Sequence, residues 1–120
     1  MANPQAIGSF PGRVGIFEVT ILSGGTQSEM LGLGAGVICG ITTPSALSGG
    51  TFHVESTNDD GVTYAPVHGE DGVQLTLIVG TSRYTKVSPQ DYAGINQLRI
   101  VSGTSEGADR LIQVHVRAID

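Results

Sequence analysis

The sequence is poor in charged and aromatic residues. Charged side chains make up only 14% of the 120 residues, against about 25% in an ordinary soluble domain. The six Lys and Arg residues are scattered, so no basic patch is available for a phosphate backbone, which argues against nucleic-acid binding. Aromatic residues make up 5% and tryptophan is absent, which leaves Tyr64, Tyr84 and Tyr92 as the only tyrosines for a sugar-stacking platform.

Cysteine is nearly absent as well. Cys39 is the single cysteine, so no disulfide can form within the chain, which fits folding in a reducing cytoplasm. Its apolar neighbours predict a buried, unreactive thiol. No apolar run reaches the ~18 residues of a membrane-spanning helix, and residues 1–11 lack the features of a signal peptide. We therefore expect a protein that is neither exported nor held in a membrane.

The length and composition predict one folded domain preceded by an arm. A chain of 120 residues can bury roughly two thirds of its unfolded surface without staples. Residues 1–12 are rich in proline and glycine and are predicted to form an N-terminal arm, whereas residues 13–120 form the domain. The low charge, with a net value of -5, also favours packing against other protein surfaces.

Glycine, with 18 residues, divides the chain into short segments rich in Val, Ile, Thr, Phe and Tyr, which predict strands. About eight strands in one small domain indicate two packed sheets or a closed barrel. We expect an all-β, antiparallel β-sandwich that resembles a jelly roll. The predicted strands are Arg13 to Leu22, Val37 to Thr43, Thr51 to Thr57, Thr63 to Val67, Val73 to Val79, Tyr84 to Val87, Gln97 to Ser102 and Leu111 to Ile119.

The first strand differs from the others. Phe52 and Val54 alternate with polar residues, which predicts a strand with one buried face. The first strand instead carries apolar residues on both faces, as expected of a strand buried on both sides or buried on one and used as an interface on the other. The predicted protein-interface residues, from the arm and this strand, are Ile7, Phe10, Pro11, Phe17, Val19 and Ile21.

Turn residues predict the connections. The sequence Thr57-Asn58-Asp59-Asp60-Gly61 is the strongest hairpin signal, and it resembles an Asp-box turn that has a structural role. Ser88 and Pro89 predict the start of one helical turn that Gly94 ends. Residues 23–36 show no strand pattern and predict a long connection or a flexible loop.

No catalytic or metal-binding constellation is evident. His53, His68 and His115 are widely spaced, and nothing in their positions requires them to converge. The acidic pairs Asp59-Asp60 and Glu70-Asp71 fall in turns, where solvated carboxylates are common. No nucleophile elbow, zinc motif or phosphate loop is present. We expect no catalytic residue, no metal, no cofactor and no enzymatic activity.

The order of several motifs resembles small β-sandwich virion proteins of tailed bacteriophages. The motifs are the sequence VESTNDDGVTYAPV at Val54 to Val67, followed by Arg83-Tyr84, Pro89 to Ala93, Leu98 to Thr104 and Ala108 to Val114. The likeness covers somewhat more than half of the chain, from Thr51 to the end. It does not extend to the N-terminal third.

This resemblance implies a head decoration, or cement, protein. Such proteins are frequently trimeric, sit on the outside of the capsid and bridge major capsid protein subunits. The expected partners are therefore the major capsid protein and further copies of the chain, with no nucleic acid and no membrane. The expected location is the capsid surface of the virion, after synthesis in the bacterial cytoplasm. An alternative from another class is a carbohydrate or host-surface binding module of a phage tail or baseplate, which exposed tyrosines on one edge would favour.

Overall fold

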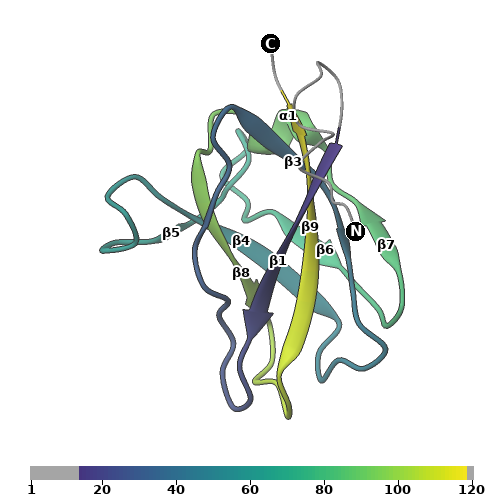
Figure 1. Ribbon diagram of the computed structural model, residues 1–120. Coiled ribbons are helices and arrows are strands. Elements are labelled where there is room, and N and C mark those ends of the chain that lie inside the picture. The colour runs from purple at the N-terminus through teal and green to yellow at the C-terminus, as the bar shows by residue number, and fades with distance from the viewer. Residues whose placement is uncertain (1–13, 119–120) are drawn as a thin grey trace.

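The computed structural model describes residues 14–118, which form two antiparallel sheets with one short helix (Figure 1). The first sheet, here called sheet A, has the strand order β1-β9-β3-β7. The second, sheet B, has the order β2-β8-β4-β5, and β6 also pairs with β4. The elements are β1 (Val14–Ile21), β2 (Leu31–Gly32), β3 (Gly36–Thr42), β4 (Thr51–Thr57), β5 (Ala65–Pro66), β6 (Thr76–Ile78), β7 (Tyr84–Lys86), α1 (Pro89–Tyr92), β8 (Gln97–Ser102) and β9 (Arg110–Ala118).

The all-β class predicted from the sequence is confirmed, and its cause is visible in the alternation of side chains. Phe52 and Val54 of β4 point inward and are almost fully buried, while His53 and Glu55 point outward. In β9, the residues Ile112, Val114 and Val116 are buried in the same way. Burial of each such side chain contributes about 1.5–3 kcal/mol. Apolar residues from both sheets therefore enclose a single core.

Within the described part of the chain, strand β1 is an edge strand of sheet A, paired there only with β9. Val19 and Ile21 face the core, with 2% and 0% of their surface exposed. Glu18 on the opposite face is exposed, and Leu22, which follows the strand, is 63% exposed. Of the two arrangements expected from the sequence, burial on both sides is therefore wrong, because no layer among residues 15–117 covers the outer face of this strand.

The turns follow the predicted chemistry in most places. Strands β4 and β5 pair as a hairpin, with Glu55 opposite Pro66. Helix α1 begins at Pro89 after Ser88, although the Ser88 side chain makes no capping hydrogen bond. Within the segment 23–36, where no strand was expected, Leu31 pairs with Leu98 to form the two-residue strand β2. The predicted strand Val73 to Val79 is shorter, since only Thr76–Ile78 pairs with β4.

Candidate interaction surface

The predicted interface residues are only partly available to a partner. Phe17 is 43% exposed. The side chains of Val19 and Ile21 belong to the core, because they lie on the inward face of β1, and they offer no surface for contact. The three predicted arm residues lie outside the described residues: Ile7, Phe10 and Pro11.

The three histidines lie in separate parts of the molecule. His53 is on sheet B, with Nε2 3.5 Å from a Glu55 oxygen. His68 is in the loop after β5, with Nδ1 3.0 Å from the Pro66 carbonyl oxygen. His115 is on sheet A, with Nε2 2.8 Å from Thr42 Oγ1. Within the described part of the chain, no three His, Cys, Asp or Glu side chains are placed to hold a metal ion.

The acidic residue Asp59 braces the β4–β5 hairpin. Its Oδ1 accepts hydrogen bonds from the Thr57 hydroxyl at 2.7 Å and from the Thr63 N–H at 2.9 Å. These two bonds lower the pKa of Asp59, because they stabilise the carboxylate. Asp60 and Gly61 take positive φ angles of 58° and 87°, as a tight turn requires. The hairpin is thus held by its own side chains.

The three tyrosines do not form a common platform. Tyr92 is 2% exposed and belongs to the core. Tyr64 lies under Arg99 of sheet B, whose guanidinium carbon is 3.6 Å from the ring centroid. Tyr84 is 52% exposed on sheet A. The arrangement that would favour sugar stacking, with all three tyrosines on one edge, is absent from residues 14–118.

A polar pocket of about 500 Å³ lies beside the hairpin, between it and the turn before β8. Its lining includes the side chains of Asp60, Tyr64, Asn96 and Gln97. The Gln97 amide already donates to Asp60 Oδ1 at 2.7 Å, so part of the polar lining is satisfied within the chain. The pocket can offer amide and carboxylate groups to a small polar ligand.

The outer face of sheet A carries an aromatic cluster. The Tyr84 ring lies over Gly40, where an added Cβ would overlap it, and it meets the His115 ring edge to face at a centroid distance of 4.9 Å. The Tyr84 hydroxyl donates to the Cys39 carbonyl oxygen at 3.4 Å. Burial lowers the pKa of His115, which favours the neutral ring at neutral pH. The aromatic cluster itself is therefore uncharged.

Cys39 lies beneath this cluster and is half-buried. Burial raises the pKa of its thiol, an effect that the charge of Arg117 only partly offsets. The Sγ–H donates to the His115 carbonyl oxygen at 3.4 Å. The thiol is therefore protonated at neutral pH, as expected of an unreactive cysteine.

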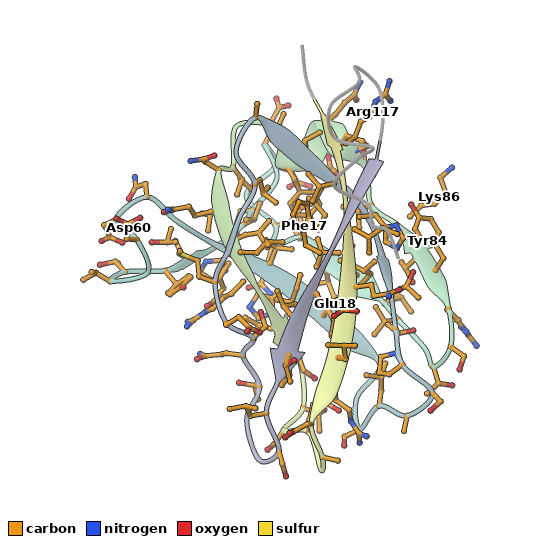
Figure 2. The ribbon with its side chains drawn as sticks, in the orientation of Figure 1. Phe17, Glu18, Asp60, Tyr84, Lys86 and Arg117 are labelled. Atoms are coloured by element: carbon orange, nitrogen blue, oxygen red, sulfur yellow. The ribbon has the colours of Figure 1, made fainter. Side chains whose placement is uncertain are left out.

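Two exposed cations lie on the same face of sheet A as the aromatic cluster. Lys86 on β7 and Arg117 on β9 are exposed on either side of β3 (Figure 2). Neither forms an ion pair with any described carboxylate, whereas Arg99 and Arg110 are both paired. We call the outer surface formed by Tyr84, Lys86 and Arg117 the basic face.

Sheet B presents the opposite arrangement on its outer face. Arg99 Nη2 lies 2.6 Å from Glu55 Oε1, and the side chains are only 18% and 15% exposed. The Tyr64 ring packs against the same guanidinium. The charge of Arg99 is therefore compensated by contacts within the chain.

Known proteins provide no further guidance, since no family model, no curated protein and no solved structure matches this chain. The likeness to phage decoration proteins therefore stays a prediction. None of the helices in residues 14–118 has the length and apolar character needed to cross a membrane.

Sequence reasoning identified the hairpin and predicted Phe17 as an interface residue, but it missed the basic face. Tyr84 and Lys86 both belong to β7, whereas Arg117 lies on β9, far away in the chain, and the pairing of β3 with β7 and β9 brings the three together. One signal was present, because a glycine inside a strand often marks a close approach by another group, and Gly40 is such a residue.

Proposed function

We propose that this chain is a structural protein of a tailed-phage virion, a decoration protein that binds the outer surface of the major capsid lattice and stabilises the head. In this proposal the two sheets form a jelly-roll-like sandwich, the protein acts as a homotrimer, and it has no enzymatic activity. Stabilisation follows from linkage, because a protein that binds the assembled shell and not its free subunits favours the shell.

The observation that carries the proposal is the basic face. Lys86 and Arg117 are exposed beside the half-exposed Tyr84 ring, and no described carboxylate neutralises them. Exposed aromatic rings flanked by arginine are typical of protein–protein contacts. The order of sequence motifs supplies the second support, since it resembles that of virion proteins.

The direct test is sedimentation of purified phage heads that lack this protein. Adding the protein back should give heads that carry it through a density gradient and that resist heat or low salt better than undecorated heads. Heads that bind none of the added protein would contradict the decoration role.

The predicted arm allows a more specific test. Deletion of residues 2–12 should leave the thermal unfolding midpoint of the domain unchanged and weaken attachment to heads. Unchanged binding of the deletion variant would remove the arm from the attachment mechanism.

The alternative, a carbohydrate or host-surface binding module, is supported by one observation, the polar pocket beside Tyr64. It predicts that the purified protein cosediments with host cells and that Asn96→Ala lowers this binding. An absence of cosedimentation would contradict the alternative and leave the decoration proposal unaffected.

A further inference from the structure

Two opposite sides of the molecule carry opposite charge. In Figure 2, Tyr84 and Lys86 lie at one side, while Asp60 lies at the other, on the projecting β4–β5 hairpin. Asp59 and Asp60 are both exposed there. We call residues 58–63 the acidic tip. The chain therefore presents an acidic projection and a basic face that point away from each other.

The basic face ends in an unpaired strand edge. Among residues 14–118, strand β7 pairs only with β3. The Arg83 carbonyl accepts from the Thr43 N–H, and the Val87 N–H donates to the Cys39 carbonyl, so these two residues face β3. Because successive residues of a strand face alternate edges, the backbone groups of Tyr84 and Lys86 point away from β3. Unpaired edge groups of this kind accept a further segment readily.

The acidic tip is preorganised for contact. The Thr57 hydroxyl accepts from the Gly61 N–H at 3.1 Å and donates to Asp59, which in turn accepts from the Thr63 N–H. At its end, Val62 is 83% exposed, the largest exposure among the large apolar residues described. A loop already fixed in one conformation loses little entropy on binding. The tip thus offers an exposed apolar residue close to two carboxylates, and the basic face offers a half-exposed aromatic ring on the same surface as two cations.

We propose that the acidic tip of one copy docks on the basic face of a second copy. In this contact Val62 packs against the Tyr84 ring, and the tip carboxylates lie near Lys86 and Arg117. The occupant is a second copy because both complementary surfaces belong to the same chain. The contact is head-to-tail, so repeated copies close a ring when the rotation permits. This inference deepens the proposed function, because it rests on the homotrimer proposed there and names the two surfaces that join its copies.

The test uses two variants of the full chain, each defective in one half of the contact. The tip variant is Asp60→Asn with Val62→Lys, in which asparagine tolerates the positive φ of position 60. The face variant is Lys86→Glu with Arg117→Glu. The control is Val73→Lys, because Val73 is 62% exposed in another turn and receives the same substitution as Val62. Circular dichroism and thermal unfolding check that each variant folds.

Sedimentation velocity then measures association. The wild type and the control should associate at low salt, with a dissociation constant that rises at least roughly tenfold when salt screens the charges. Each charge variant alone should be monomeric. A labelled tip variant mixed with the unlabelled face variant should associate again, because the intact tip of one meets the intact face of the other.

Three results would overturn the inference. These are a monomeric wild type at low salt, folded variants that associate as the wild type does, or a mixture of the two variants that stays monomeric. Charge variants that lose head binding while self-association is unchanged would assign these surfaces to the capsid instead. Failure of self-association with normal head binding would remove the homotrimer from the proposed function and leave its capsid-binding role standing.

Discussion

The positively charged side chains on the outer faces of the two sheets have different surroundings. On sheet B, Arg99 is held between Glu55 and the Tyr64 ring, so its charge is compensated within the chain. On sheet A, Lys86 and Arg117 are exposed and make no ion pair with a described carboxylate. The comparison indicates that one face serves the stability of the fold, whereas the other is available to a partner.

A second compensated charge lies at the end of the sandwich near the start of β9. Glu106 is 1% exposed, and its carboxylate accepts hydrogen bonds from the Ser48 N–H, the Ser102 hydroxyl and Arg110 Nε at 2.7–2.9 Å. Burial alone would raise the pKa of Glu106, but these bonds and the Arg110 charge outweigh it and lower the pKa. Glu106 thus joins three segments of the chain.

The largest expected effect comes from breaking this buried network. Glu106→Ala should lower the free energy of unfolding by about 3–5 kcal/mol, because Arg110 and the hydroxyl of Ser102 lose their acceptor. Urea denaturation measures the change. The exposed Glu70 in a turn provides the matched control, and Glu70→Ala should cost less than about 0.5 kcal/mol. Equal effects of the two substitutions would contradict a special role for Glu106.

The two faces can be compared directly by removing one cation from each. Arg99→Met should cost about 2 kcal/mol, since Glu55 loses a charged hydrogen-bond partner in a half-buried position. Lys86→Met should change stability by less than about 0.5 kcal/mol. The measurement is chemical denaturation of both variants. A larger cost at Lys86 would reverse the assignment of the two faces.

A smaller effect is expected for the aromatic cluster of the basic face. Gly40→Ala should displace the Tyr84 ring and cost about 1 kcal/mol, the size of the aromatic contact with His115. In a Tyr84→Ala background the same change should cost almost nothing, because the overlapping ring is gone. A double-mutant cycle measures this coupling, and additive effects would show that the ring does not depend on Gly40.

The smallest effect concerns pH. Because burial lowers the pKa of His115 below its usual 6.5, the unfolded chain binds the proton more readily. The free energy of unfolding should therefore fall as the pH drops through about 6.5 towards the folded-state pKa. His115→Gln should remove this part of the slope between about pH 7.5 and 5.5. The carboxylates Asp59 and Glu106 have lowered pKa values. The stability that depends on their ionised forms is therefore lost at a lower pH than the contribution of His115. An identical slope in the variant would contradict burial of the ring.

The sequence predicted those features that depend on local pattern. Alternation at Phe52 and Val54 identified the buried face of β4, and the turn chemistry of Asp59 and Gly61 identified the hairpin. The burial of Glu106 could not be predicted, because the residue lies in a Gly- and Ser-rich loop that is typical of a solvated turn. Its partners Ser48 and Ser102 are brought to it only by the tertiary fold.

The candidate site was predictable to a lesser degree. The sequence indicated β1 because both of its faces carry apolar residues, but the pattern alone does not show which of these side chains the core buries. In the structure Phe17 is 43% exposed, while Val19 and Ile21 are buried. The basic face depends on the register of three strands, which no local signal specifies.

The most direct test of the difference between the two faces is sedimentation equilibrium of the Lys86→Glu, Arg117→Glu variant, alongside its thermal unfolding. We predict an unfolding midpoint equal to that of the wild type and self-association weakened by at least roughly tenfold at low salt. Unchanged self-association, or a midpoint lowered as much as by Arg99→Met, would contradict the proposal that the exposed charges of sheet A bind a partner.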